Sequence, residues 1–370
     1  MSEDRKPRVA VVFGGRSSEH AVSCISAGSV LAAIDRAAYD VVPIGITREG
    51  RWVLAADEPA KLAITGGALP SVDESGSSVV LTGDPTDRRM VVLEPGKVPQ
   101  ELGDVDVVLP LLHGPYGEDG TLQGLLELAG VTYVGSGVFA SAAAMDKGHM
   151  KALLSAAGLP IGSYAVVTPR QWASDPIAVR ETVAGLGYPV FVKPCRAGSS
   201  VGISKVTGPQ DLVEAIEAAR EHDPRVIVEA AVDGREIECG VLEGLDGGEP
   251  EASVPAEVVV EGHEFYDFDA KYLPDEGTRL DVPADLPDDV AGEIQELACR
   301  AFDVLSCEGL ARVDFFLEPG GRVLVNELNT MPGFTPSSMF PLMWKASGLD
   351  YPRLVDRLLR TALERPAGLR

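Results

Sequence analysis

The sequence predicts a multidomain protein of the α/β and α+β classes whose N-terminal domain contains a parallel sheet. Residues 8–46 follow the order strand, glycine turn, helix, strand, which is typical of the opening of a parallel α/β sheet. After residue 157 the pattern changes to a smaller unit in which short strands and helices mix. A length of 370 residues is too great for one small core, so we expect two or three domains.

Three stretches of chain, 1–140, 141–235 and 236–370, are the predicted domains. In the first we expect strands at 8–13, 41–46 and 106–112, helices at 19–33 and 121–129, and a meander of short strands at 52–54, 79–81 and 90–93. In the second we expect helices at 141–157 and 211–221 and strands at 190–194, 203–206 and 226–232. In the third we expect strands at 236–242 and 253–260, a loop at 262–281, helices at 288–305 and 351–364, and a hairpin at 309–329.

Composition argues against several classes of protein. The formal net charge is −24, whereas a nucleic-acid binder usually shows a basic patch, so we expect no nucleic-acid partner. No stretch is apolar over the roughly 18–20 residues that a membrane helix needs, and the N-terminal apolar run is too short for a signal peptide. The five cysteines are scattered and form no C-x-x-C pair, which suits a reducing cytosol. We therefore expect a cytoplasmic protein without a membrane partner.

The segment 311–329 consists of two apolar runs joined by Glu-Pro-Gly-Gly, which indicates a hairpin. Because strand side chains alternate between faces, Arg312 shares a face with Asp314, and Glu327 shares a face with Asn329. The hairpin therefore carries an arginine, two carboxylates and an amide that can gather on one side of the sheet.

The register of this hairpin follows from its turn. If 319–320 form a two-residue turn, counting back pairs Asp314 with Val325 and Arg312 with Glu327. Carboxylates that converge repel unless a cation joins them, and hard oxygen ligands suit Mg²⁺, which also binds substrate phosphates. The alternative is a ladder of surface salt bridges on an amphipathic hairpin.

A lysine and a glycine-serine loop form the second candidate site. Lys193 ends an apolar strand and is followed by the small residues 197–202, whose backbone N–H groups can approach an anion closely. The loop is not a Walker A motif, and it can equally be only a turn. Lys147, Glu229 and Glu236 are further candidates for a nucleotide site, although each can also be a solvated charge.

Eight blocks of sequence, in order, resemble the ATP-grasp enzymes and, within them, the D-alanine–D-alanine ligase family. The blocks are GGRSSEH at 14–20 with VS at 22–23, HGPYGEDG at 113–120, GSG at 135–137, MDK at 145–147, VKP at 192–194 with GSSVG at 198–202, YDFDAKY at 266–272, RVD at 312–314 and ELNTMPG at 327–333. Together they span nearly the whole chain. The resemblance implies a three-domain ATP-grasp architecture whose N-terminal parallel-sheet domain is Rossmann-like.

The resemblance also implies which residues bind ATP and its metal ions. Two Mg²⁺ ions, for which Mn²⁺ can substitute, would be bound by Asp314, Glu327 and Asn329. The ATP contacts would be Lys147 and Lys193 on the phosphates, Glu229 on adenine, Glu236 on the ribose, Ser199 and Ser200 over the γ-phosphate, and Lys271 from a mobile lid at 262–281.

Two molecules of D-alanine are the implied co-substrates. Their contacts would be Glu19 on the ammonium of the first D-alanine with His113 close by, Arg312 and the backbone N–H of Gly333 on the oxyanion, and Ser338 on the carboxylate of the second D-alanine. Tyr272 would close on Ser199 and Glu19. Tyr272 also favours a dipeptide product, because relatives that use D-lactate tend to carry other residues there.

The implied reaction joins two D-alanines through an acyl-phosphate at the expense of ATP, for peptidoglycan precursor synthesis. One alternative is another ATP-grasp carboxylate–amine ligase, of the D-alanine–D-serine or D-alanine–D-lactate type. A second is a nucleotide-binding module without catalysis, and a third is an oxidoreductase, which the absence of a G-x-G-x-x-G fingerprint disfavours. Relatives are commonly dimers, so we expect a homodimer formed through the first domain.

Overall fold

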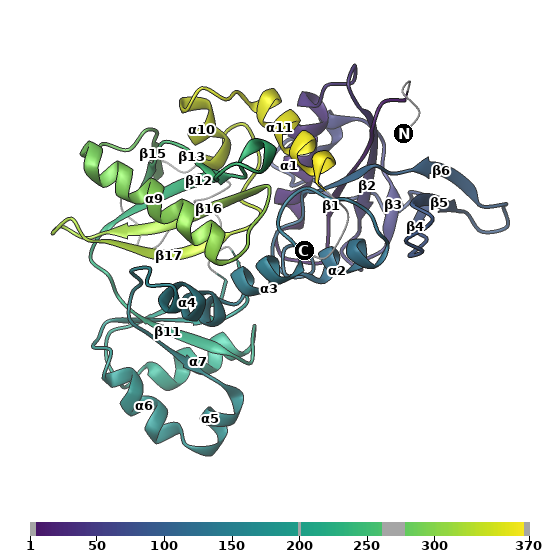
Figure 1. Ribbon diagram of the computed structural model, residues 1–370. Helices are drawn as coiled ribbons and strands as arrows, with labels where there is room; N and C mark the ends of the chain where they lie inside the picture. The colour runs from purple at the N-terminus through teal and green to yellow at the C-terminus, as the bar shows by residue number, and fades with distance from the viewer. Residues whose placement is uncertain (1–4, 199–200, 261–277, 366–370) are drawn as a thin grey trace.

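The computed structural model describes residues 5–198, 201–260 and 278–365, and it contains three β-sheets that follow one another along the chain. Figure 1 shows the first sheet beside the third, with the second sheet and its helices below the third. The first two sheets lie within the first two predicted stretches, and the third sheet begins at Arg235, one residue before the third stretch; the domain boundaries stay a prediction.

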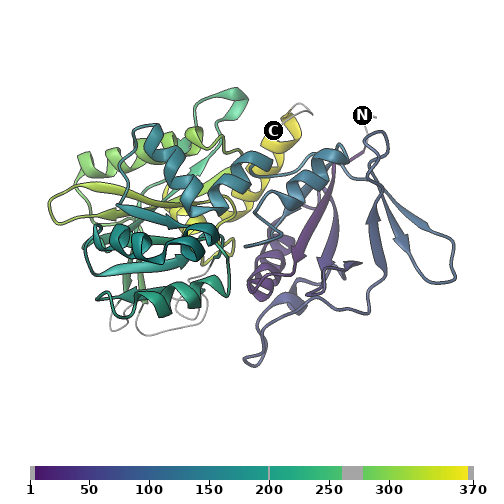
Figure 2. The same ribbon diagram turned by 90° about the horizontal axis from the view of Figure 1, so that it is seen from below.

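The first sheet has seven strands in the order β6-β5-β4-β3-β2-β1-β7. The strands are β1 (Arg8–Gly14), β2 (Asp40–Ile46), β3 (Trp52–Leu54), β4 (Ser78–Leu81), β5 (Arg89–Leu93), β6 (Gln100–Asp104) and β7 (Val107–Pro110). The parallel strand pairs of this sheet are β1–β2 and β1–β7. The predicted parallel sheet is therefore a mixed sheet, extended by an antiparallel meander that reaches away from the rest of the molecule (Figure 2). The polar strand β6 was not predicted.

Strand β1 lies between β2 and β7, and its residues 9–13 are almost completely buried, as expected for a strand covered on both faces. It ends at Gly14 and Gly15, which have φ angles of 92° and 94°, and the chain then turns into α1 (His20–Ala33). Ser23 of that helix accepts a hydrogen bond from the N–H of Gly14 at 2.7 Å. This turn fixes where the first residues of α1 lie relative to the carboxyl ends of the parallel strands.

We expect Gly14→Ala to destabilise the protein strongly, because a Cβ at this position would lie 2.3 Å from the carbonyl oxygen of Ile46 at a φ angle of +92°. The clash and the strained backbone together should cost roughly 2–4 kcal/mol of unfolding free energy. Denaturant unfolding monitored by circular dichroism measures this cost. Gly158→Ala is the matched control, because its φ angle is +77° but no atom lies within 4 Å of its Cβ. Equal losses for the two variants would contradict the steric argument.

The second sheet has the antiparallel order β10-β9-β11-β8. Its strands are β8 (Tyr164–Val167), β9 (Val190–Pro194), β10 (Ser204–Val206) and β11 (Val226–Ala230), and its helices are α5 (Pro169–Ser174), α6 (Pro176–Ala184) and α7 (Leu212–Arg220). Strand β8 and helices α5 and α6 were not predicted from the sequence. Helix α7 packs on β9 and β10, so this sheet has its own hydrophobic core.

The stretch predicted to be helical at 141–157 is helical in the structure, but it is divided in two at Asp146. The structure contains two helices, α3 (Val138–Met145) and α4 (Lys147–Ala156), separated by Asp146 in an extended conformation. The Asp146 side chain accepts a hydrogen bond from the N–H of His149 at 3.1 Å, so it caps α4. Both helices pack on the core of the third sheet rather than on that of the second.

The third sheet has the main order β15-β14-β12-β16-β17, with β13 paired to β12. The strands are β12 (Arg235–Leu242), β13 (Glu251–Ala252), β14 (Ala256–Val260), β15 (Thr278–Asp281), β16 (Leu310–Leu317) and β17 (Val323–Asn329). Helix α9 (Asp288–Val304) lies on one face and α10 (Met339–Ala346) packs against β12. The last four residues of the predicted loop 262–281 form strand β15, which pairs with β14, so the prediction is wrong there. Residues 261–277 lie outside the described part of the chain.

The predicted pairing of the hairpin is also wrong, although its four polar residues do share a face. In the structure Arg312 pairs with Asn329 and Asp314 pairs with Glu327. The first shift occurs at the turn, where Gly321 has a φ angle of 83° and adds a third residue to the loop. The second is a bulge at residue 326, opposite the Asp314–Phe315 step. Two one-residue shifts restore the original face.

The C-terminal helix returns to the first sheet. Helix α11 (Tyr351–Glu364) buries its apolar face in one core with residues of β1 and α1, and Figure 1 shows it beside α1. The hydroxyl of Tyr39 donates a hydrogen bond to Asp356 at 2.8 Å across this contact. Two short 3₁₀ helices, Pro59–Leu62 and Leu245–Gly247, and α2 (Thr121–Leu128) complete the described elements.

Candidate active site

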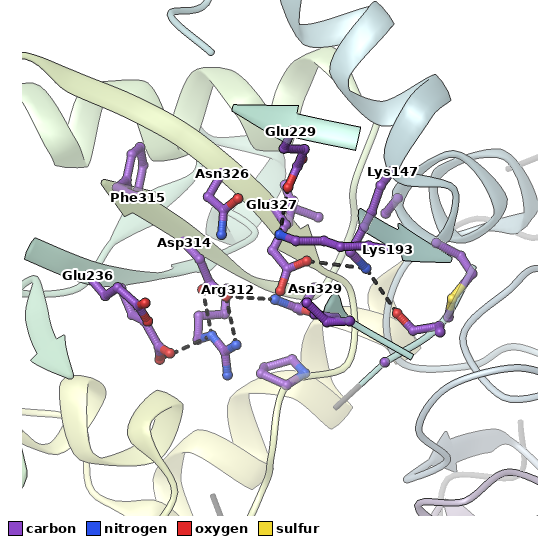
Figure 3. Close-up of a pocket in the computed structure, with 18 of the residues that line it drawn as sticks. Lys147, Lys193, Glu229, Glu236, Arg312, Asp314, Phe315, Asn326, Glu327 and Asn329 are labelled. Carbon is purple, nitrogen blue, oxygen red and sulfur yellow. Dashed lines mark hydrogen bonds and ion pairs between the residues drawn. The ribbon is translucent and has the colours of Figure 1, made fainter. Parts of the chain in front are cut away.

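A cleft of about 380 Å³ lies where the three sheets meet. Its lining includes eleven of the predicted site residues: Glu19, His113, Lys147, Lys193, Glu229, Glu236, Arg312, Asp314, Glu327, Asn329 and Gly333. Figure 3 shows the two lysines pointing into the cleft from one side and Arg312 and Asp314 lying on the other. Residues from all three predicted domains thus converge on one cavity.

The basic end of the cleft contains Lys147 and Lys193, both mostly buried. The Nζ atom of Lys147 lies 3.3 Å from Glu327 and donates to the carbonyl of Ala197 at 2.9 Å. The Nζ atom of Lys193 lies 2.6 Å from Glu229. Burial alone would lower the pKa of Lys193, but the carboxylates of Glu229 and Glu327 raise that pKa above its ordinary value. Lys193 is therefore charged at neutral pH, as phosphate binding requires.

An apolar part of the cleft lies between the second and third sheets. It is lined by Phe191, Ile203, Val232, Phe316 and Leu328. Glu229 and Glu236 lie in the same lining. Apolar lining with a few polar groups has the character of a pocket that binds a small organic ligand.

The hairpin face gathers its charges as the sequence suggested. Arg312 donates two parallel hydrogen bonds to Asp314, at 2.7 and 2.8 Å, and lies 3.1 Å from Glu238. Asn329 donates to the same Asp314 carboxylate at 3.1 Å. Burial alone would lower the pKa of Arg312, but Asp314 and Glu238 raise it well above its ordinary value. Glu238 was missed by the sequence analysis; its position two residues after Glu236 on the same strand face was the available signal.

The donor set fits Mg²⁺ in its chemistry. In the described part of the chain no group of three or more His, Cys, Asp or Glu side chains could hold a metal ion. Asp314 and Glu327 are directly cross-strand neighbours, and Asn329 lies two residues further along the same face. Mg²⁺ commonly takes only one or two carboxylates and completes its shell with phosphate oxygens and water. This set therefore suits an ion that arrives with a phosphorylated substrate.

A further part of the cleft is built by the loops that follow β1 and β7. Glu19 is buried and lies against Gly114 and Gly198, where an added Cβ would be 2.7 and 2.9 Å from its Oε2 atom. His113 is buried, and its Nδ1 atom lies 3.0 Å from the carbonyl oxygen of Met331. Burial lowers the pKa of His113, so its imidazole is neutral at neutral pH.

Glu118 is a cleft residue that the sequence analysis left without a role. Its carboxylate accepts hydrogen bonds from the N–H of Gly114 at 2.7 Å and from the N–H of Met331 at 3.2 Å. It thereby joins the 113–120 loop to the segment that precedes Gly333. Burial and the nearby charge of Glu19 raise the pKa of Glu118 to about 8.

We expect the stability of the protein to depend on pH through Glu118. Its folded-state pKa of about 8 lies above the ordinary value of 4.5, so its stabilising contribution is complete below pH 4.5 and is lost as the pH rises through 8. In Glu118→Gln the side chain stays neutral at every pH. Thermal unfolding of both proteins from about pH 5 to about pH 9 should show the native protein losing stability relative to the variant. A constant difference between the two proteins would contradict this assignment.

Five predicted site residues are not in the described lining of the cleft: Ser338 is described but lies outside it, and the other four lie outside the described residues. Gly333 lines the cleft, but Ser338 is outside its lining and forms a hydrogen-bonded turn with Thr335, at 2.8 Å between the hydroxyl oxygens. Ser338 also precedes α10 directly. The predicted residues Ser199, Ser200, Lys271 and Tyr272 lie outside the described residues.

Comparison with known proteins identifies the family. Two family models match, the D-ala D-ala ligase N-terminus over residues 8–136 and the D-ala D-ala ligase C-terminus over residues 153–360. A curated relative, the D-alanine--D-alanine ligase of Streptomyces griseus, is 58% identical over 99% of this chain and 95% of its own length. The chain belongs to the D-alanine–D-alanine ligase family, and the family predicted from the sequence is confirmed.

Solved structures agree with this assignment. The VanG D-Ala:D-Ser ligase of Enterococcus faecalis superposes with a TM-score of 0.84 at 37% identity, covering 97% of this chain and all of that one. The D-alanine-D-alanine ligase of Coxiella burnetii gives a TM-score of 0.80 at 34% identity, covering 97% and 94%. The predicted fold class is thereby confirmed. Among the described residues, no helix is both long and apolar enough to cross a membrane.

Proposed function

We propose that this protein joins two molecules of D-alanine to D-alanyl-D-alanine, with ATP as the energy source and a D-alanyl phosphate as the intermediate. The observation that carries the proposal is the convergence of eleven predicted site residues from the three predicted domains on one cleft. Family membership supports the same reaction, because curated relatives that carry this name are 54–59% identical to the chain.

The nucleotide would bind across the basic end of the cleft. The apolar part of the cleft would take the adenine together with Glu229, Glu236 would contact the ribose, and Lys147 and Lys193 would hold the phosphates. Phosphoryl transfer depends mainly on positioning and on neutralising charge, which buried lysines supply without covalent chemistry. Ser199, Ser200 and Lys271 remain predicted contacts to the phosphates.

Asp314, Glu327 and Asn329 would hold two Mg²⁺ ions, which would neutralise charge on the phosphates. For this, Asp314 and Glu327 must exchange the cations that now contact them, Arg312 and Lys147. Both basic side chains line the cleft and would gain another anionic partner there, since Lys147 is assigned to the phosphates and Arg312 to the oxyanion.

The two amino acids would bind in the part of the cleft that is built by the loops after β1 and β7. Glu19 would accept hydrogen bonds from the ammonium group of the first D-alanine, with His113 beside it. The carboxylate of the first D-alanine attacks the γ-phosphate of ATP, and ADP leaves. The amine of the second D-alanine then attacks the acyl carbon of the D-alanyl phosphate and expels phosphate. Arg312 and the N–H of Gly333 would stabilise the tetrahedral oxyanion. An acyl-phosphate hydrolyses in water, which gives the predicted lid with Tyr272 its purpose.

The carboxylate of the second D-alanine is assigned to Ser338, which would have to leave its hydrogen bond with Thr335. We retain the expectations of a homodimer formed through the first domain and of a cytoplasmic location. A D-alanine–D-serine ligase is the second candidate, because the solved relative from Enterococcus faecalis carries that name.

Phosphate release with ATP and Mg²⁺ tests the proposal. We expect release with D-alanine but not with L-alanine or without an amino acid, and mass spectrometry should identify the dipeptide. A mixed assay with D-alanine and D-serine distinguishes the two candidates by the mass of the product. The absence of phosphate release with D-alanine would reject the proposed reaction.

A further inference from the structure

Lys151 is a nearly buried lysine next to the cleft that the proposed reaction does not use. Its side chain is 3% exposed, and its Nζ atom lies 2.9 Å from the Oε1 atom of Glu229. The other oxygen of the same carboxylate, Oε2, lies 2.6 Å from Lys193. Glu229 is therefore held between two lysines, one of which lines the cleft while the other lies behind it.

The position of Lys151 is fixed by elements other than the one that carries Glu229. Lys151 belongs to α4, whose residues Met150 and Leu154 are buried in the core of the third sheet. Its Nζ atom also donates to the carbonyl oxygen of Asn326, the extra residue of the bulge in β17, at 2.9 Å. Lys151 thus has a fixed anchor on the third sheet, from which it reaches Glu229 on β11 of the second sheet.

The charges of these three groups do not balance. Two lysines share the one carboxylate of Glu229, and of the two only Lys193 lies in the cleft, where the carboxylate of Glu327 also attracts it. Burial alone would raise the pKa of Glu229, but Lys193 and Lys151 lower that pKa to about 2. A buried carboxylate needs at least one cation, since breaking a buried ion pair is costly. One lysine can satisfy that need, and the other is then available to a second anion.

We propose that Lys151 is a positioning residue that serves as the permanent counter-ion of Glu229 and so releases Lys193 to bind the phosphates of the nucleotide. The inference rests on the proposed nucleotide site. Lys193 has a side chain in the cleft, where phosphates can reach it, whereas Lys151 is held by Asn326 and Glu229. If Lys151 lost its charge, Lys193 would have to remain with Glu229, and nucleotide binding would have to break that pair.

The experiment measures the Kd of a non-hydrolysable ATP analogue with Mg²⁺ by calorimetry, for the native chain and for Lys151→Met. We expect the Kd of Lys151→Met to rise by roughly 10–100-fold, as when one member of a buried charge pair is removed. The KM for D-alanine should stay close to the native value. Lys205→Met, which removes an exposed lysine from β10, is the control for net charge and should bind as the native chain does.

A double-mutant cycle with Glu229→Gln separates this role from simple structural support. Once the carboxylate is gone, Lys193 no longer needs to be released, so adding Lys151→Met to Glu229→Gln should change the Kd by less than about 3-fold. Equal effects of Lys151→Met in both backgrounds would overturn the proposal and assign Lys151 to its contact with Asn326. If Lys151→Met does not fold, Lys151→Gln keeps a donor without the charge and should show the same coupling.

The native chain in the same experiment tests the proposed function separately. Failure of the native chain to bind the ATP analogue would reject the nucleotide site itself. Native binding together with an unchanged Kd for Lys151→Met would reject only the role of Lys151.

Discussion

Asp314→Asn should lower kcat by at least about 10³-fold while the protein remains folded. Metal ions contribute several kcal/mol to the stabilisation of a phosphoryl-transfer transition state, and each 1.36 kcal/mol is about a factor of ten in rate. An amide in place of the Asp314 carboxylate removes a negative charge from the proposed metal site. The fold should tolerate the change, because Arg312 keeps Glu238 at 3.1 Å as a partner. Phosphate release and thermal unfolding measure the two effects.

The matched control for Asp314→Asn is Glu318→Gln, at the turn of the same hairpin. It removes the same charge from a carboxylate whose nearest ion-pair contact is to the exposed Arg322, at 3.7 Å. Glu318→Gln should keep native kcat. Near-native activity of Asp314→Asn would remove Asp314 from the metal site and leave the hairpin face as a set of structural ion pairs.

Arg312→Lys is expected to lower kcat by about 10²–10³-fold, the usual cost of losing one donor to an oxyanion. Lysine keeps the positive charge but lacks the planar fork with which Arg312 bonds both oxygens of Asp314. The remaining ammonium would stay with Asp314 or Glu238, and the oxyanion would lose its donor. Steady-state kinetics should show the loss mainly in kcat, with a smaller change in the KM for ATP.

Arg322→Lys provides the comparison for Arg312→Lys, because Arg322 lies at the exposed turn of the same hairpin. Its kcat should match that of the native protein. A kcat for Arg312→Lys within a few-fold of native would show that charge alone suffices at this position, and the oxyanion role would then fall to the N–H of Gly333.

Strand periodicity was enough to predict the shared polar face of the hairpin but not its pairing. The alternation of side chains placed Arg312 with Asp314 and Glu327 with Asn329. The pairing depends on two single-residue insertions, one at Gly321 and one at residue 326, which hydrophobic patterning does not reveal. The predicted face was correct because two such insertions cancel, whereas one alone would have turned Glu327 to the opposite face.

Other parts of the site depend on contacts between segments far apart in sequence. Glu118 meets Met331 at a separation of 213 residues, and Lys151 meets the carbonyl of Asn326 at a separation of 175.

The break between α3 and α4 at Asp146 is a local feature. No glycine or proline marks it; the capping side chain of Asp146 produces it. The position of Lys151 near the cleft could have been predicted locally, because it lies four residues after Lys147 and thus on the same side of α4.

The return of α11 to the first sheet has a consequence for how the chain folds during synthesis. The core shared by β1, α1 and α11 includes residues from Val9 to Ala362, and the Tyr39–Asp356 hydrogen bond closes a sequence separation of 317 residues. N-terminal domains generally fold first as a chain emerges from the ribosome. Here the core of the first sheet is completed only by α11, so part of its apolar surface stays uncovered until residues 351–364 have been synthesised.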